Sequence, residues 1–346
     1  MTLSAVASFT QKFIIFFVLA VILGIASFIG YKAWYANYLA HLPPVEEKPE
    51  IKWGVLPSPD FPASGIFTNN FSYTIDTQSG LLALEKFGTV AKVYFIPKGV
   101  TTFLSSQRAL DLALKFGISG QPEILSETKH RFKKDDKTIV IDVDTSNFNY
   151  IKDATSAAKL AAKLSGDSNL IVRDFKNFLA NKNLMKDELR DGPVKLQYLK
   201  FIGSQLAPSD ANEAQAAQIS IWPKDINNKQ IVTPNTNKAL VSAIFTKSAS
   251  ELENYINLEY IYWPVDIEIS STYPIKSAEA AFNELKGGKG IIILAPDKTQ
   301  VSITSIKLAY FEGDKYSSYL EPVFVFEGPS FISYIPAITE QYLQAK

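Results

Sequence analysis

The chain of 346 residues is long enough for about two domains, and its 47% hydrophobic and 20% charged residues allow a full-sized hydrophobic core. Its 35 basic and 35 acidic residues cancel, which leaves no net positive charge to attract nucleic acid. The absence of cysteine excludes disulfides, thiolate nucleophiles and cysteine-ligated metals, and the two histidines, His41 and His130, have no second histidine at metal-ligand spacing. We expect both histidines to be exposed or partly packed.

The first predicted element is a membrane-spanning helix. Phe13 to Tyr31 is an uncharged run of 19 residues, the length that crosses the hydrocarbon layer of a bilayer. Trp34 and Tyr35 follow it, as aromatic residues do at a membrane surface. A cleaved signal peptide is the alternative, but its apolar stretch would be shorter and would end in small residues, so an uncleaved anchor is favoured. We therefore predict a short tail over 1–12, a transmembrane helix over 13–34 and contact with the lipid bilayer through Phe13 to Tyr31.

The orientation of this helix and the segment after it form the next prediction. Basic residues near the two ends of the helix are nearly equal in number, so they favour neither orientation. Because the N-terminal tail is too short to hold a domain, we expect a single-pass signal-anchor with the C-terminal bulk on the extracytoplasmic side. Residues 35–64 are rich in proline and are predicted to be an extended linker. Apolar residues such as Trp53 and Phe61 leave open that its second half packs on the domain.

A short internal repeat follows the linker. Residues 106–117 and 277–288 carry Ser, Ala, Leu, Lys and Gly at identical spacing. Each is predicted to be a short amphipathic helix with Ser106 or Ser277 as N-cap and glycine at its C-terminal end. Strand-like runs precede both helices, and two strand-like runs around a polar turn follow both. Each unit is therefore predicted to be a strand, a helix and an antiparallel hairpin, with chance similarity of two amphipathic helices as the alternative.

The remaining elements complete an α+β fold in which helices pack on antiparallel sheets. The predicted strands of the two units are 90–96, 123–129 and 138–144, then 260–263, 265–269, 301–310 and 320–327. Between the units, we predict a helical region over 153–189, strands over 194–202, 218–222, 230–232 and 239–246, and a tight turn at 226–229. The predicted domains after the linker are a first α+β domain over 65–152, a helical pair over 153–190, and a second α+β domain over 191–346 that contains the repeat of the first unit.

This arrangement resembles the PepSY-type and YycH/YycI-like envelope proteins, which carry small helix-plus-hairpin units behind one N-terminal anchor. The resemblance rests on the helices that begin at Ser106 and Ser277 and on the hairpin strands 139–144 and 322–327. It covers roughly residues 85–150 and 255–335. It implies a protein that binds or restrains a partner such as a sensor kinase or protease, and it supplies no catalytic residues.

Three short patterns in the sequence are candidates for sites of chemistry. Gly287 to Gly290 is rich in glycine, but it follows a helix and is interpreted as a helix stop, not as a phosphate-binding loop. Asp142 and Asp144 alternate with apolar residues, which is typical of the solvated face of a strand. This interpretation is favoured, and the alternatives are a pair of glycosidase carboxylates or a calcium site. Ser156 and Lys159 have the spacing of a Ser/Lys hydrolase without its companion motifs, and helix positions are the favoured interpretation.

Aromatic residues gather in one region of the sequence: Tyr255, Tyr260, Tyr262, Trp263 and Tyr273. They indicate one of two things: a surface that binds glycan or peptide, or packing between side chains of neighbouring strands. Packing is favoured. The sequence therefore nominates no catalytic, cofactor-binding or metal site.

The first functional hypothesis is a non-enzymatic, membrane-anchored protein of a bacterial-type cell envelope that binds or regulates a neighbouring protein or cell-wall component. The first alternative is a cell-envelope hydrolase that uses carboxylates or the Ser156/Lys159 pair. The second is a structural spacer or assembly component. No cofactor and no nucleic acid is expected as a partner.

Overall fold

The computed structural model describes residues 3–40, 48–62, 71–77, 87–153, 162–164, 167–248 and 252–345. The chain forms two compact units, Met1–Glu47 and Lys48–Lys346.

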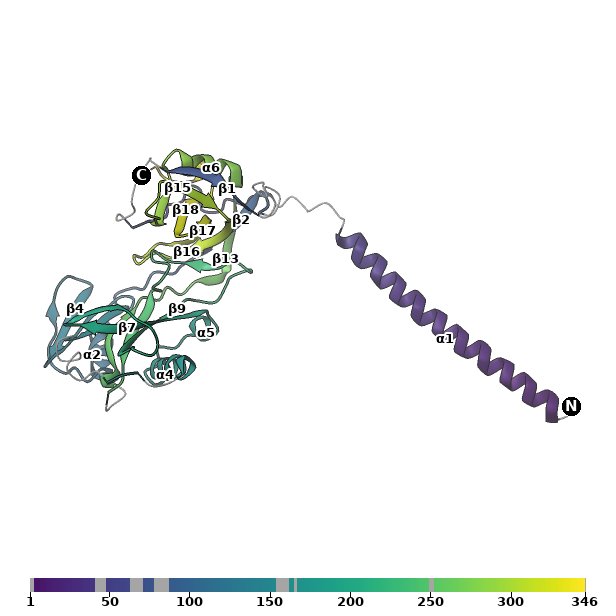
Figure 1. Ribbon diagram of the computed structural model, residues 1–346, viewed down its shortest axis with the longest axis horizontal. Helices are drawn as coiled ribbons and strands as arrows, with labels where there is room; N and C mark the ends of the chain where they lie inside the picture. Colours follow the sequence, from purple (N-terminus) through teal and green to yellow (C-terminus); the bar gives the residue numbers. More distant parts are fainter. Residues whose placement is uncertain are drawn as a thin grey trace. The chain divides into compact units, whose positions relative to one another are not determined.

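The first unit contains the helix α1 (Leu3–Ala40), which is a single continuous helix in Figure 1. Its segment Phe16–Tyr35 is 20 residues long, has a mean hydropathy of 2.0 and is not buried by the rest of the protein. The helix is thus long and apolar enough to cross a membrane, as predicted. The helix α1 extends beyond the predicted transmembrane segment 13–34 at both ends, and no proline interrupts the chain before Pro43.

The described part of the second unit contains a nine-stranded sheet in which all neighbouring strands are antiparallel. Its strands, in order across the sheet, are β3 (Glu123–Ile124), β4 (Lys129–Lys134), β5 (Lys137–Asp142), β6 (Phe148–Lys152), β12 (Tyr255–Tyr260), β11 (Val241–Thr246), β9 (Ala216–Ile221), β7 (Val194–Ile202) and β8 (Gln205–Pro208).

The same described residues form a seven-stranded sheet and a small parallel pair. The seven-stranded sheet contains β10 (Ile231–Val232), β16 (Ser305–Phe311), β17 (Tyr319–Gly328), β18 (Phe331–Pro336) and β14 (Ile291–Leu294), with β2 (Val90–Phe95) joined to β17 and β13 (Asp266–Pro274) joined to β2. The parallel pair is β1 (Ser72–Ile75) with β15 (Gln300–Ile303). The predicted α+β class with antiparallel sheets is confirmed.

Helices cover one face of the nine-stranded sheet. Figure 1 shows α2 (Ser105–Lys115) and α4 (Ser168–Asn181) beside this sheet, where they contact β5 and β7. Apolar side chains at helical spacing face inward from both helices, and they pack on alternate residues of the strands. Phe116, just after α2, and Phe178 of α4 are both fully buried in this core. The short helix α5 (Asp187–Arg190) adds the buried Leu189.

A second core lies under the seven-stranded sheet, where α6 (Ala278–Lys286) packs on β18. Ser277 is the N-cap of α6, because its Oγ accepts a hydrogen bond from the N–H of Ala280 at 3.1 Å. The helix stops at Gly287, and Gly288 has a φ of 76°, a backbone conformation that glycine adopts without steric cost. Both features agree with the sequence prediction.

The cap of the first repeat helix was predicted incorrectly. The helix α2 begins at Ser105, its N-cap is Leu104, and no side chain caps it. The Oγ of Ser105 accepts a hydrogen bond from the N–H of Thr102 at 2.9 Å, and this buried side chain fixes the turn before the helix. Ser106 is exposed on the first turn and caps nothing.

The hairpin after α2 also differs from the prediction. The strand predicted over 123–129 covers only the short β3, and the hairpin is formed by β4 and β5. Inward-facing His130 and Phe132 make β4 a half-buried strand despite its basic residues. His130 is 6% exposed, so the prediction of an exposed or partly packed side chain was wrong for this histidine.

The two sheets share segments on both sides of the predicted domain boundaries. Strand β2, from the predicted first domain, pairs with β13 and β17 of the predicted second domain. Strands β7 to β9, β11 and β12, all after residue 190, continue the sheet that β3 to β6 begin. The boundaries at 152 and 190 therefore do not separate the two sheets.

A cluster of ion pairs ties the start of β5 and the end of β6 to the short 3₁₀ helix η2 (Leu252–Asn254). Glu253 accepts hydrogen bonds from the ammonium groups of Lys137 and Lys152, and these bonds lower the pKa of Glu253. The side chain of Lys152 is only 6% exposed, and Asp136 lies 4.0 Å from its Nζ. Loss of the glutamate would therefore leave a poorly solvated ammonium group without its nearest carboxylate.

We expect Glu253→Gln to lower the free energy of unfolding by about 1–3 kcal/mol at pH 7. Because the folded-state pKa of Glu253 lies below its ordinary value of 4.5, this stabilisation is present above pH 4.5 and is lost as the pH falls through the lowered pKa. Urea unfolding at pH 7 and pH 3 measures both effects. Asp187→Asn, which breaks the exposed pair of Asp187 with Arg190, is the control and should change stability by less than about 0.5 kcal/mol. A loss in E253Q as small as in this control would contradict the prediction.

Candidate functional site

The described residues enclose a groove of about 440 Å³ between the nine-stranded sheet and the connection from β16 to β17. We call it the inter-sheet groove. Its floor is the face of the nine-stranded sheet that α2 and α4 leave uncovered. Its lining residues are Lys98, Thr128, Lys129, Val140, Asp142, Asp144, Thr145, Asn147, Phe148, Asn149, Glu259, Ile261, Trp263, Asp314, Lys315 and Tyr316.

The strand register explains why this floor is polar. Val140, Asn149 and Glu259 are consecutive partners across β5, β6 and β12. Their strand neighbours Ile139, Ile141, Phe148, Tyr150 and Leu258 belong to the buried core. Side chains alternate between the two faces of a strand, so the residues between core positions gather on the opposite face. The groove floor is therefore the polar half of an alternating pattern.

The wall of the groove is held rigidly by hydrogen bonds from two aromatic residues. The indole N–H of Trp263 donates to the carbonyl of Gly313 at 2.9 Å, and the hydroxyl of Tyr316 donates to the carbonyl of Ile96 at 2.8 Å. The ammonium of Lys98 lies 5.8 Å from the centre of the Tyr316 ring. These contacts bring three distant segments of the sequence to one wall.

Asn147 is the residue of the groove whose hydrogen bonding is incomplete. It is 8% exposed, and its Oδ1 accepts a hydrogen bond from the N–H of Tyr262 at 2.9 Å. Its Nδ2 has no hydrogen-bond partner among the described residues. A buried amide N–H without a partner costs about 1–3 kcal/mol, so an acceptor from a bound molecule would recover free energy here.

The two aspartates that the sequence singled out lie in this groove, but local hydrogen bonds occupy them. Oδ1 of Asp142 accepts hydrogen bonds from the N–H of Asp144 at 3.2 Å and from both the N–H and Oγ1 of Thr145 at 3.0 and 2.9 Å. Asp144 accepts a hydrogen bond from Thr101. These contacts form the turn between β5 and β6, and they favour a structural role for Asp142 over proton transfer. No group of three or more His, Cys, Asp or Glu residues able to hold a metal ion occurs in the described ranges.

The aromatic residues that the sequence grouped divide between packing and the groove. Tyr255, Tyr260 and Tyr273 are almost completely buried. Trp263 reaches the groove wall, and half-buried Tyr262 donates a hydrogen bond from its hydroxyl to Glu188 at 3.1 Å. The structure thus uses most of this cluster in the core, as the favoured interpretation predicted.

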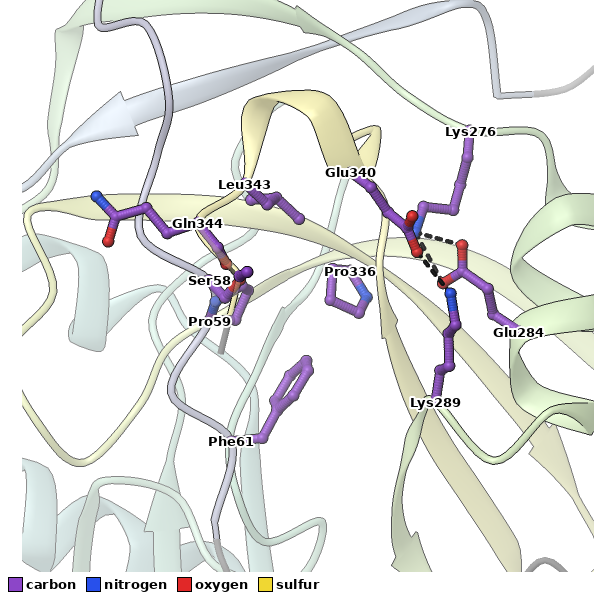
Figure 2. A pocket seen from close by; sticks show the side chains of 11 residues that line it. Ser58, Pro59, Phe61, Lys276, Glu284, Lys289, Pro336, Glu340, Leu343 and Gln344 are labelled. Carbon is purple, nitrogen blue, oxygen red and sulfur yellow. Dashed lines mark hydrogen bonds and ion pairs between the residues drawn. The ribbon is translucent and has the colours of Figure 1, made fainter.

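A second pocket, of about 570 Å³, lies near the C-terminal end of the described chain. Figure 2 shows two ion pairs on one side of it, Lys276 with Glu284 and Lys289 with Glu340, both at 2.8 Å. Ser58, Pro59 and Phe61 form the opposite side. The hydrogen bond between Lys289 and Glu340 raises the pKa of the lysine and lowers that of the glutamate. Because each ammonium is already paired with a carboxylate, this pocket offers a ligand less than the inter-sheet groove does.

Three residues considered in the sequence, His41, Ser156 and Lys159, lie outside the described residues. Sequence reasoning missed Asn147 and the wall residues 314–316. Asn147 sits in an ordinary polar turn, and only the register of the folded strands places it opposite residues some 165 positions later in the sequence. No local signal could have identified it.

Comparison with known protein families finds no match, and no curated protein matches the sequence. Among solved structures, the chain is similar to an uncharacterized protein from Eubacterium rectale ATCC 33656, with 12% sequence identity and a TM-score of 0.33 over 77% of this chain and 89% of that chain. A likeness this distant assigns no function.

Proposed function

We propose that the protein is a non-enzymatic, single-pass membrane protein of a bacterial-type cell envelope, with its second unit on the extracytoplasmic side. In this proposal α1 is the anchor, and the inter-sheet groove binds part of a neighbouring protein or cell-wall component. The resemblance to PepSY-type and YycH/YycI-like proteins supports a binding or regulatory role.

One observation carries the binding part of the proposal. Asn147 is buried at the groove with an amide N–H that no described residue accepts, although buried polar groups are normally satisfied. Around it, the ammonium groups of Lys98 and Lys129 line the same hollow, whereas the carboxylate of Glu259 is already paired with Lys238. A ligand that presents hydrogen-bond acceptors matches this lining.

The hydrolase alternative receives less support from the described residues. Catalytic carboxylates need a free face toward the substrate, whereas local hydrogen bonds hold Asp142 and Asp144, and Glu259 forms an ion pair with Lys238. A spacer role would not by itself account for the unpaired amide of Asn147.

Site-specific photo-crosslinking in intact cells tests the binding site. A photoreactive amino acid in place of Lys129, on the groove rim, should capture a discrete partner, whereas the same amino acid in place of exposed Ile202 should not. Asn147→Asp keeps the acceptor for Tyr262 and removes the N–H donor, so it should lower the captured yield about 3- to 10-fold. Asn177→Asp, on the exposed side of α4, is the matched control. Equal capture from positions 129 and 202, or unchanged yield in N147D, would refute a ligand site at the groove.

Membrane topology is tested in a separate experiment. Because the chain contains no cysteine, a single thiol can be introduced and labelled. Lys134→Cys places one thiol at the exposed last residue of β4. We expect a membrane-impermeant maleimide to label it in intact cells. Labelling only after cell lysis would place the second unit in the cytoplasm and overturn this part of the proposal.

A further inference from the structure

The strand β13 carries an exposed apolar bulge near its start. Asp266 is the partner of Phe95 on β2, and the next paired residue, Ser270, is the partner of Tyr94. The three residues between them therefore have no partner on β2 and project from the ladder. Two of them, Ile267 and Ile269, have 60% and 47% of their surface exposed.

This bulge has a fixed conformation. Oδ1 of Asp266 accepts hydrogen bonds from the N–H groups of Glu268 at 3.0 Å and Ile269 at 3.3 Å. A side chain that satisfies two successive backbone donors stabilises a tight turn. The two isoleucines are thus held at the surface by an ordered turn, at the usual cost of exposing apolar side chains to water.

The bulge lies beside the place where the chain joins the second unit. The N–H of Glu50 donates to the carbonyl of Thr272, the N–H of Lys52 donates to Oγ of Ser271, and Nζ of Lys52 donates to the carbonyl of Ser270, at 3.1, 3.0 and 3.3 Å. Ser270 directly follows Ile269. The first residues of the unit are therefore hydrogen-bonded to the part of β13 that directly follows the bulge.

The length of the connection limits how far this place can be from the anchor. Seven residues separate Ala40, the last residue of α1, from Lys48, and a fully extended connection would span at most about 29 Å. The apolar span of α1 ends at Tyr35, only five residues before Ala40. The length of the connection thus sets an upper limit on the distance between the bulge and a membrane that holds α1, and it permits the two to meet.

We infer that Ile267 and Ile269 insert into the surface of the bilayer that holds α1, as a second and shallower membrane contact. The inference rests on the proposed membrane anchoring. A lipid surface fits better than a protein partner, because a stable protein interface needs about 800 Å² on each side and a two-residue wedge offers far less. Acyl chains can accept such a wedge without a complementary pocket.

Single-cysteine labelling of the full chain tests the inference. Ile267→Cys, Ile269→Cys and Ile202→Cys, each labelled with an environment-sensitive nitrobenzoxadiazole dye, are reconstituted into phosphatidylcholine vesicles that contain lipids with a nitroxide quencher near the headgroup. Ile202, at the end of β7, is the matched control because 62% of its surface is exposed. We expect quenching at positions 267 and 269 to be at least threefold stronger than at position 202.

A fourth label separates failure of this inference from failure of the proposed anchoring. Gly24→Cys places the dye in the middle of α1, where an added Cβ has no described atom within 4 Å apart from the neighbouring backbone of the same helix. If a dye at position 24 is not quenched by an acyl-chain nitroxide, the anchoring itself is refuted. If it is quenched while positions 267 and 269 behave like position 202, the anchoring stands and the second contact is refuted. If position 267 showed no lipid quenching, and a photoreactive amino acid at this position captured a cellular protein, the bulge would be assigned to a protein partner instead.

Discussion

Replacing Glu312 with glutamine is expected to abolish most of the fall in stability that the protein undergoes between about pH 5 and pH 8. Glu312 follows β16, is 3% exposed, and has no side-chain hydrogen bond or ion pair among the described residues. Burial away from water disfavours its ionised form and raises its pKa to about 8. Glutamine keeps the size of the side chain and carries no ionisable proton.

The direction of this pH dependence follows from the number of protons that the folded and the unfolded chain bind. The unfolded chain releases the proton of Glu312 near its ordinary pKa of 4.5, whereas the folded chain holds it until about pH 8. Between these values the folded state binds one more proton, so the free energy of unfolding falls as the pH rises. The full effect is at most about 5 kcal/mol above pH 8, since one pKa unit corresponds to about 1.4 kcal/mol.

Urea unfolding of the wild type and Glu312→Gln at pH 5 and pH 8 measures this effect. We expect the variant to be more stable than the wild type by about 2–5 kcal/mol at pH 8 and within about 1 kcal/mol of it at pH 5. Glu268→Gln, at an exposed position of β13, should leave the wild-type pH dependence unchanged. If the free energies of unfolding of the wild type and E312Q changed with pH in parallel, Glu312 would release no proton on unfolding in this range, and the prediction would be wrong.

Phe178→Ala is expected to destabilise the protein by about 3–5 kcal/mol, because it removes a large, fully buried ring. Phe178 projects from α4 and contacts Tyr255 of β12, with ring centres 4.2 Å apart, and Phe116, at 6.2 Å. Its loss would open a cavity where α4, the end of α2 and the nine-stranded sheet meet. Chemical denaturation followed by far-ultraviolet circular dichroism at pH 7 measures the change.

The matched control for this prediction lies on the same helix. Leu170→Ala changes an apolar residue of α4 that is 44% exposed, and we expect a loss of less than about 1 kcal/mol. If F178A and L170A were destabilised equally, α4 would not be docked through Phe178.

Local patterns in the sequence predicted individual elements well. The run Val194–Ile202 is β-branched and aromatic enough to identify β7 with its observed bounds. Asn227 and Asn228 were predicted to form a tight turn, and both adopt a positive φ, which asparagine tolerates better than most residues. Ser277 and Gly287 mark the ends of α6 because capping depends only on neighbouring backbone groups.

The pairing of distant strands could not be predicted in the same way. The repeat suggested that β2 and α2 belong to one unit, yet β2 pairs with β13 and α2 packs on the other sheet. Nothing in the alternation of a strand specifies its partner, since apolar faces fit many neighbours. The inter-sheet groove escaped prediction for the same reason, because Asn147 and Tyr316 come to line one groove only after the strands have paired.

The late pairing of β2 has a consequence for the way the protein is made. Strand β2 ends at Phe95 and β13 begins at Asp266, so about 170 residues must be synthesised before this partner exists. At roughly 5–20 residues per second, that interval is on the order of 10–30 s. During it the nascent chain exposes an aromatic, β-branched strand that can pair with other chains. A ribosome-bound or partly exported intermediate with this strand unprotected should therefore depend on chaperones until the last quarter of the polypeptide emerges.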